Sequence, residues 1–391
     1  MKIVMLCDFF DEKLQYQENL LAKYYTKHGH SVVIISSTYN SAFDYYAEKS
    51  NKKEHQRHYS YEGYKIYKQK YSLNIFYKLR KLSKVPYILN SEKPDLIFVH
   101  DIHLNIFDAT NYIKVNPNCK MIMDYHADYS NSANNWLSIN FLHKIIRKKL
   151  ILSRNKKYIS KIFPVVPTSA QFLNELYDIP YEDMEILPLG SDTDLSMEVM
   201  SKSYGLEIRK KLEISKDSFV IFTGGKFNPV KKTELLIDAF HQLNVSDIHL
   251  IIVGDASEEN KDYKELLLSK INGNVKIHFL GWQSNFDMYK YLNASDLAVF
   301  PQSQSVLWQQ AISMELPLIV GVLPGSNVDY LNKYNNIIIL NKQDITSENI
   351  AYNIKLLLDN KSRLADMKMG AKKITNELLN WNNLILKTLN L

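Results

Sequence analysis

Short runs of β-branched and other apolar residues alternate with helix-like stretches along almost the whole chain. In the first half, strands are expected at residues 3–7, 32–36, 96–100, 121–125 and 162–166. The alternation restarts after residue 200, with strands expected at 219–223, 249–253, 276–280, 297–300, 318–320 and 337–339. This pattern is typical of parallel sheets wrapped by helices. Because single cores seldom grow beyond about 250 to 300 residues, the 391-residue chain is expected to form two doubly wound α/β domains that face each other across a cleft.

A turn-rich stretch separates the two halves. Residues 187–194 read Leu-Pro-Leu-Gly-Ser-Asp-Thr-Asp, and domain boundaries usually fall in segments of this composition. We therefore expect an N-terminal Rossmann-like domain at 1–195 and a C-terminal Rossmann-like domain at 196–375. A last helix, over about 376–391, is expected to pack back on the first domain.

Composition narrows the class of protein and its compartment. With 46% hydrophobic and 23% charged residues, the chain has the composition of an ordinary globular protein. Its apolar runs, such as 316–320 and 337–340, are far shorter than the roughly 20 residues of a membrane span. Residues 1–8 lead straight into a strand without the features of a signal peptide, and two cysteines are too few for a disulfide framework. A reducing cytoplasm is therefore expected.

Two lysines five residues apart follow the first strand of the second half. Gly224 and Gly225 come directly before Lys226, and Lys231 stands before an amphipathic helix with apolar residues at 235, 236, 239, 240 and 243. Glycines let a backbone approach a ligand closely, and anions favour helix N-termini at the carboxyl ends of parallel strands. The pattern predicts a diphosphate site, although two solvated lysines are the simpler interpretation of this segment alone.

Segment 225–240 resembles the second-domain signature of retaining GT-B glycosyltransferases (group 1, family 4-like), in which a basic residue is followed five places later by a lysine. Further segments resemble the same family in the same order along the chain: 18–35, 187–192, 250–255, 275–282 and 294–301. The resemblance therefore extends nearly from end to end. It implies a GT-B fold in which the second domain binds a nucleotide-sugar donor and the first domain faces the acceptor.

The donor loop departs from the family pattern. Family members usually carry two glutamates eight residues apart, the second of which holds the donor ribose, and alignment places Gln302 and Gln310 at these positions. An amide oxygen can still accept a hydrogen bond from a hydroxyl, although more weakly than a carboxylate. Ser303 and Ser305 replace the glycine loop, and together with the amides of a helix beginning near Val306 they are expected to grip a phosphate.

Polar residues at strand ends of the first half mark the sugar side of the site. The family carries a histidine at the end of the fourth strand that reaches the donor sugar, and His126 matches it; a histidine that merely caps a strand is the alternative. Asp101 and His103 belong to a polar cluster after the third strand, where acceptor contact is expected because three ligands from one tight turn rarely bind metal. The bulky loop 8–17, which ends at Gln17, is expected to shape the acceptor side.

A basic segment at 143–161 is the strongest signal for a partner. It holds eight Lys or Arg residues and no Asp or Glu, interleaved with leucine and isoleucine as in a basic amphipathic helix. A second stretch, 64–84, mixes seven basic residues with tyrosines. Each basic residue near anionic lipid contributes about 1 kcal/mol, so reversible binding to the inner face of the cell membrane is expected, with a solvated helix face as the alternative. A net charge of only +6 and the lack of a nucleic-acid motif argue against a nucleic-acid partner.

Residues and resemblance together predict a cytoplasmic, peripherally membrane-bound glycosyltransferase. It would move a sugar from a nucleotide diphosphate donor, expected to be a UDP-sugar, to a capsule-like cell-surface polysaccharide or a lipid-linked glycan. Retention of configuration is implied by the resemblance alone. Lys226 and Lys231 would stabilise the leaving diphosphate, so neither a metal nor a cofactor is expected. Two alternatives stay open: a catalytically silent GT-B scaffold, suggested by the loss of both acidic residues, and a nucleotide-sugar epimerase, which would need acidic residues near the sugar.

Overall fold

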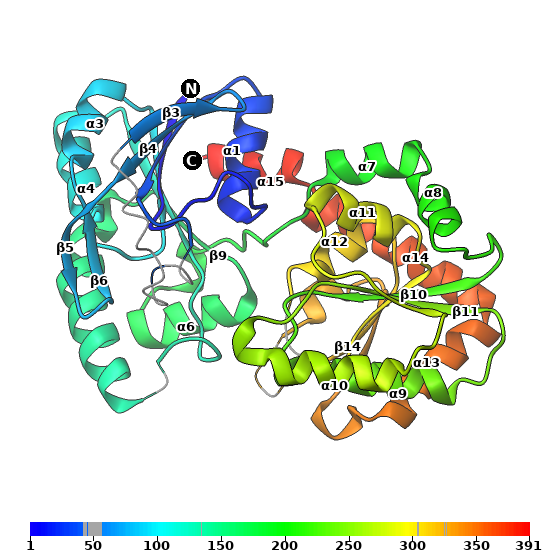
Figure 1. Cartoon of the computed structure of the whole chain (residues 1–391). Helices are drawn as coiled ribbons and strands as arrows, with labels where there is room; N and C mark the ends of the chain where they lie inside the picture. The colour runs from blue at the N-terminus through cyan, green and yellow to red at the C-terminus, as the bar shows by residue number, and fades with distance from the viewer. Residues whose placement is uncertain (42–44, 46–56, 134, 303–304, 324, 326) are drawn as a thin grey trace. The chain divides into compact units, whose positions relative to one another are not determined.

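The structure of the chain is a computed structural model that describes residues 1–391 except 42–44, 46–56, 134, 303–304, 324 and 326 (Figure 1). The chain forms two units, one of Met1–Leu189 with Trp381–Leu391 (unit 1) and one of Gly190–Asn380 (unit 2). Sequence reasoning places the divisions at 195/196 and near 376, whereas the structure places them at 189/190 and 380/381. The difference arises because a parallel β-bridge joins Ser191 to Asn380, which ties both crossing segments into unit 2.

Unit 1 is built on a seven-stranded sheet with the order β3-β4-β2-β1-β7-β8-β9, in which only the β3–β4 pair is antiparallel. Its strands are β1 (Lys2–Leu6), β2 (Ser31–Ser37), β3 (Arg57–Tyr61), β4 (Tyr64–Gln69), β7 (Leu96–His100), β8 (Lys120–Tyr125) and β9 (Lys161–Pro164). A separate hairpin consists of β5 (Tyr71–Ile75) and β6 (Leu79–Leu82). The direction of strand order reverses between β1 and β7, and ligands of such sheets bind at the carboxyl ends of the strands beside this reversal.

The core of unit 1 lies on both faces of its sheet. Along β1, Val4 and Leu6 enter one apolar cluster while Ile3 and Met5 enter another, because successive side chains of a strand point to opposite faces. The first cluster is covered by α3 (Val85–Glu92), α4 (Ile106–Val115), α6 (Pro167–Tyr177) and the π-helix η1 (Ser138–Leu152), which continues into α5 (Ser153–Asn155) and η2 (Lys156–Tyr158). The second is covered by α1 (Gln17–Lys27) and α15 (Trp381–Leu389).

The helix α15 belongs to unit 1 although it is last in the chain. Trp381, Leu384 and Ile385 are buried in the same cluster as the strand residues of β1, and the hydroxyls of Tyr25 and Thr388 form a buried hydrogen bond. The ribbon shows α15 beside α1, so that the last helix of the chain and the first lie in one layer (Figure 1). Burial of these apolar side chains fixes the helix to unit 1.

Unit 2 is a six-stranded parallel sheet with the order β12-β11-β10-β13-β14-β15. Its strands are β10 (Phe219–Gly224), β11 (Ile248–Val253), β12 (Ile277–Phe279), β13 (Leu297–Phe300), β14 (Leu318–Gly321) and β15 (Ile337–Leu340). One face is covered by α11 (Asn285–Asn293), α12 (Leu307–Ser313) and α14 (Lys361–Ile374), and the other by α9 (Thr233–Gln242), α10 (Lys261–Ile271) and α13 (Ser347–Asp359) (Figure 1). Helices α7 (Thr193–Ser201) and α8 (Tyr204–Lys211) precede the sheet.

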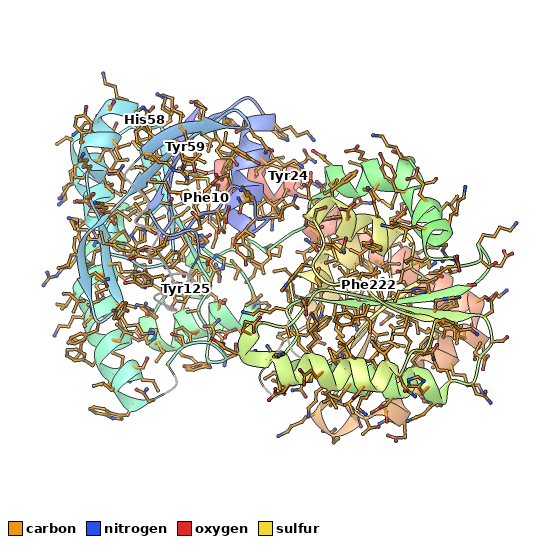
Figure 2. All side chains as sticks on the ribbon, in the orientation of Figure 1. Phe10, Tyr24, His58, Tyr59, Tyr125 and Phe222 are labelled. Carbon is orange, nitrogen blue, oxygen red and sulfur yellow. The ribbon has the colours of Figure 1, made fainter. Side chains whose placement is uncertain are left out.

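In unit 2, too, successive side chains of a strand enter apolar clusters on opposite faces of the sheet. Phe222 of β10 lies in the cluster beneath α11 and α12, whereas its neighbour Ile221 lies in the cluster beneath α9 and α10 (Figure 2). Here too the order of strands reverses, between β10 and β13. The prediction of two Rossmann-like α/β domains with parallel sheets is confirmed.

Candidate active site

The reversal of strand order in unit 2 brings together the two loops that sequence reasoning singled out. β10 and β13 are neighbours in the sheet, with Ile221 opposite Leu297 and Phe222 opposite Ala298. Lys226 follows β10 and the donor loop follows β13, so both loops leave the same carboxyl edge. This edge is where open parallel sheets bind ligands.

Close backbone packing explains the glycines at this edge. Gly225 has φ +126°, and a Cβ on Gly254 would lie 2.0 Å from the carbonyl oxygen of Gly225, so a side chain there would clash with the backbone. A Cβ on Gly224 would come within 3.3 Å of the side chain of Leu307, the first residue of α12. The β10 loop and the start of α12 are therefore in contact.

The two lysines occupy different positions on the β10 loop. Lys226 is exposed just after Gly225, whereas Lys231 is half-buried at the end of the 3-10 turn η4 (Pro229–Lys231) that leads into α9. Asn228 begins this turn, and its side chain accepts a hydrogen bond from the amide of Val230 at 3.0 Å. Burial lowers the pKa of Lys231. A cation that is already partly desolvated interacts more strongly with a phosphate than one in bulk water.

Gln310 lies on α12 with an amide oxygen that is ready to accept a hydrogen bond. The residue is 9% exposed, and its Nε2 donates to Oδ1 of Asn285 at 3.3 Å. Its Oε1 is buried and has no hydrogen-bond partner among the described residues. Such an atom costs free energy unless a ligand satisfies it.

The rest of the donor loop is described only in part. Ser303 lies outside the described residues. The Oγ of Ser305 accepts a hydrogen bond from the amide of Leu307 at 3.3 Å, and α12 begins at Leu307, one residue after the expected Val306. Gln302 is half-exposed after β13. The structure thus brings Gly224, Gly225 and α12 together but leaves the phosphate-gripping role of the serines as a prediction.

Unit 1 contains a pocket of about 370 Å³ at its own reversal of strand order. The loop after β1 contributes Asp8 and Phe9, and the segments after β7 and β8 contribute residues 100–103 and 125–127. Glu18 of α1 and Arg80 of the β5–β6 hairpin complete this part of the wall. Three predicted site residues, His126, Asp101 and His103, thus line a single pocket.

A buried carboxylate joins two histidines of this pocket. Asp124, which is fully buried at the end of β8, has its Oδ2 2.8 Å from Nδ1 of His100 and 3.3 Å from Nε2 of His126. The two imidazole rings lie 4.4 Å apart. Burial alone would lower the pKa of His100, but the charge of Asp124 and its hydrogen bond raise this pKa to about 10. Burial alone would raise the pKa of Asp124, but the two histidines hold that pKa well below its usual range. His126 is therefore oriented by an ionised carboxylate behind it.

The backbone around His126 is held by neighbouring polar residues. Asp101 has φ +62°, and its Oδ1 accepts a hydrogen bond from the amide of His126 at 3.0 Å, while its own amide donates to Asp124 at 3.1 Å. The Nε2 of His103 is buried without a partner among the described residues, and burial lowers its pKa. Residues in unfavourable backbone conformations concentrate at functional sites.

Three side chains of this pocket region are close enough together to hold a metal ion. The ligand atoms of His100, Asp124 and His126 all lie within 4.8 Å of one another, a spacing that a metal ion could bridge, although in the structure they bond to one another. Metal independence therefore stays a prediction.

Gln17 is 4% exposed at the start of α1, and neither atom of its amide has a hydrogen-bond partner among the described residues.

The basic segment 143–161 does not form one solvated basic face. Lys148, Lys156 and Lys161 form ion pairs with Asp178, Asp183 and Glu185 respectively, and Arg147 lines the unit 1 pocket. The remaining four basic residues, Lys144, Lys149, Arg154 and Lys157, are exposed. Exposed apolar side chains lie on the same helical region: Trp136, Leu137, Phe141 and Ile145. Within the described part of the chain, no helix is long and apolar enough to cross a membrane.

Two family models match the chain, one to each half. The model described as Glycosyltransferase Family 4 matches residues 19–195, and the model described as Glycosyl transferases group 1 matches residues 206–374. The first match falls almost entirely in unit 1 and the second in unit 2.

Curated relatives and solved structures agree with these matches. The chain is 26% identical over 267 residues to an uncharacterised glycosyltransferase of Methanocaldococcus jannaschii, covering 62% of this chain and 59% of the relative. It is 26% identical over 256 residues to the lipopolysaccharide 1,2-N-acetylglucosaminetransferase of Salmonella typhimurium, covering 61% of this chain and 57% of the relative. Both matches span less than two thirds of the relatives' length. The structure of Anabaena HepE in complex with UDP superposes with a TM-score of 0.66 at 17% identity, covering 100% of both chains, which shows a shared fold.

Proposed function

Since the first half of the chain matches the Glycosyltransferase Family 4 model and the second half matches the Glycosyl transferases group 1 model, we propose that the chain transfers a sugar from a nucleotide diphosphate donor to a glycan acceptor. The observation that carries this proposal is the carboxyl edge of unit 2, where the strand order β10-β13 sets the Lys226 loop against α12. HepE, which shares the fold, was crystallised with UDP, and a UDP-sugar is the donor we propose for this chain.

Each group at this edge has a task in binding or releasing the donor. Breaking the bond between sugar and nucleotide leaves negative charge on the diphosphate, and in this proposal Lys226 and Lys231 stabilise that charge without a metal. Gln310 offers its unsatisfied Oε1 to a ribose hydroxyl, as a neutral replacement for the usual glutamate. A donor site that relies on side-chain amides and lysines in this way requires no cofactor.

The pocket of unit 1 is the site that we assign to the sugars. His126, oriented by Asp124, can contact a sugar hydroxyl, and the carboxylates of Glu18 and Asp101 can accept hydrogen bonds from others. Retention of anomeric configuration and a polysaccharide or lipid-linked acceptor are part of this proposal and rest on the family resemblance.

We place the enzyme at the cytoplasmic face of a membrane through its η1 region. The exposed cations Lys144, Lys149, Arg154 and Lys157 stand on the same helical region as the exposed side chains of Trp136 and Phe141. Such a mixture of basic and large apolar side chains is typical of interfacial helices. Lipid-linked acceptors are presented at such an interface.

A silent scaffold is the second candidate, favoured by Gln302 and Gln310 at positions that are acidic in the family. Calorimetry with UDP separates the two functions, because a scaffold has no need to retain a nucleotide site. We expect micromolar binding by the wild type and weaker binding by Lys226→Ala. Lys216→Ala, which changes an exposed lysine in the turn before β10, serves as the control. If the folded wild type did not bind UDP, the proposed donor would be wrong. If it also bound none of a panel of other nucleoside diphosphates, the scaffold would be the better assignment.

A further inference from the structure

Arg147 is a cation in the unit 1 pocket that pairs with no acid among the described residues. It comes from η1, where the sequence pattern predicts a membrane-binding basic helix, but it lines the pocket and its Nε is buried without a hydrogen-bond partner in the described chain. Arg80 on the same pocket differs, since its Nε donates to Asp8 at 2.7 Å and its guanidinium lies over the ring of Phe9. A half-buried guanidinium with an unused donor can bind a carboxylate or a phosphate, because its planar set of N–H donors matches the spacing of the oxygens in these groups.

A chain of hydrogen bonds leads from Tyr125 through Tyr177 and His143 to the hydroxyl of Ser132. The Tyr125 hydroxyl (Figure 2) donates to the hydroxyl of Tyr177 at 3.4 Å, and the latter lies 2.7 Å from Nδ1 of His143. The Nε2 of His143 lies 3.0 Å from Oγ of Ser132, which lines the pocket. If Tyr177 accepts from Tyr125 and donates its own proton to Nδ1, then Nε2 carries the imidazole proton and donates to Ser132. The proton of Ser132 is then left for a ligand.

The protonation state of His143 agrees with this direction. His143 is buried, and burial together with the nearby charge of Arg147 lowers its pKa to about 4. A neutral imidazole has one donor and one acceptor nitrogen, as the chain of hydrogen bonds requires. Two donors therefore line the same pocket, the guanidinium of Arg147 and the hydroxyl of Ser132.

We propose that the unit 1 pocket binds a ligand that carries an oxyanion, either phosphate or carboxylate, beside sugar hydroxyls, and that Arg147 and Ser132 recognise this oxyanion. The hydroxyls have acceptors in the carboxylates of Glu18 and Asp101 on the same pocket. That this ligand is the acceptor substrate rests on the proposed function. The inference narrows the acceptor from any glycan to an acidic sugar or a sugar phosphate.

The test measures binding of glucose, glucose 6-phosphate and glucuronate to the full chain by NMR titration at millimolar ligand concentration. We expect both acidic sugars to bind the wild type roughly tenfold more tightly than glucose, since charge-assisted hydrogen bonds exceed neutral ones. Arg147→Gln should remove this preference, Arg147→Lys should keep part of it, and Ser132→Ala should weaken acidic sugars a few-fold. Arg363→Gln, which changes an exposed arginine of α14 in unit 2, should change nothing. A preference for one of the two acidic sugars identifies the oxyanion.

Two results would overturn the inference. The first is equal affinity of the wild type for glucose and both acidic sugars, and the second is an unchanged preference in folded Arg147→Gln and Arg147→Lys proteins. Calorimetry with UDP on the same preparations tests the proposed function separately. If Arg147→Gln weakened UDP binding instead of acidic-sugar binding, Arg147 would belong to the donor and the acceptor assignment would fail.

Discussion

Replacing the buried carboxylate of Asp124 by an amide is the most informative single change in unit 1. Asp124→Asn keeps the size of the side chain but removes the charge that His100 and His126 share at 2.8 and 3.3 Å. Breaking a buried, hydrogen-bonded charge pair costs about 3 to 5 kcal/mol. The rise in the pKa of His100 from 6.5 to about 10 sets a similar upper limit, about 5 kcal/mol. At about 2 to 4 °C per kcal/mol, the melting temperature of the unit should fall by roughly 10 °C.

The loss of stability should depend on pH in a defined direction. The pKa of His100 is higher in the folded protein than in the unfolded chain, so its contribution is complete below pH 6.5 and disappears as the pH rises through about 10. The pKa of Asp124 is lower in the folded protein, so its contribution is present above its ordinary value of 3.8 and is lost as the pH falls. The difference in unfolding free energy between wild type and variant should therefore be largest between about pH 4 and 6.5.

Histidine NMR signals followed through a pH titration, together with thermal melts, provide the measurement. In the variant the pKa of His100 should fall well below 10, because the largest charge that opposes burial is lost and only the weaker effects of Glu18 and Asp101 remain. Asp95→Asn, which alters an exposed carboxylate at the opposite end of β7, is the matched control and should leave His100 unchanged. A wild-type His100 that titrates near 6.5, or a stability difference that is constant from pH 6.5 to 10, would refute the reasoning.

Three further predictions concern the donor edge and the membrane. Lys226→Ala should lower turnover by on the order of a hundredfold in a transfer assay with an identified donor, since it removes a charge contact to the leaving diphosphate; wild-type rates would exclude that role. Gln310→Ala should weaken UDP binding by about 1 kcal/mol in calorimetry, whereas Gln310→Glu should preserve or strengthen it, and an unchanged affinity of the alanine variant would displace Gln310 from the ribose. The protein should sediment with vesicles of acidic lipid, and less of it should do so as salt rises. Charge reversal at four exposed positions should abolish this binding: Lys144, Lys149, Arg154 and Lys157. Reversal of the ion-paired Lys148 and Lys156 should have less effect. Binding that salt does not weaken would exclude an electrostatic attachment.

Sequence periodicity predicted most of the sheet strands because those strands are buried on both faces and read as uninterrupted apolar runs. The region 57–82 was missed. β4 does alternate between buried and exposed residues, but Lys68 is fully buried at one of its inward positions, where its amine donates to the carbonyl of Phe10. A lysine in that position masks the apolar pattern, and the segment reads as a basic surface instead.

The sequence suggested candidate site residues where they follow a strand, because the carboxyl edge of a parallel sheet brings such residues together. His126, Asp101 and the Lys226 loop fall in this group. Arg147 and Asp124 could not be assigned in the same way. The first lies in a π-helix, whose period differs from 3.6 residues and which sequence patterns do not distinguish from an α-helix. The second lies inside strand β8, where a carboxylate is tolerated only because two histidines from separate segments converge on it.

The position of α15 also constrains how the polypeptide acquires its structure during synthesis. Strands β1 to β9 leave the ribosome first, yet the layer formed by α1 stays incomplete until Trp381, Leu384 and Ile385 have been translated. Throughout the synthesis of unit 2, the nascent chain therefore exposes the apolar surface that these side chains later cover. A ribosome that stalls or terminates within unit 2 would release a product whose N-terminal half exposes this apolar surface, which chaperones and proteases recognise.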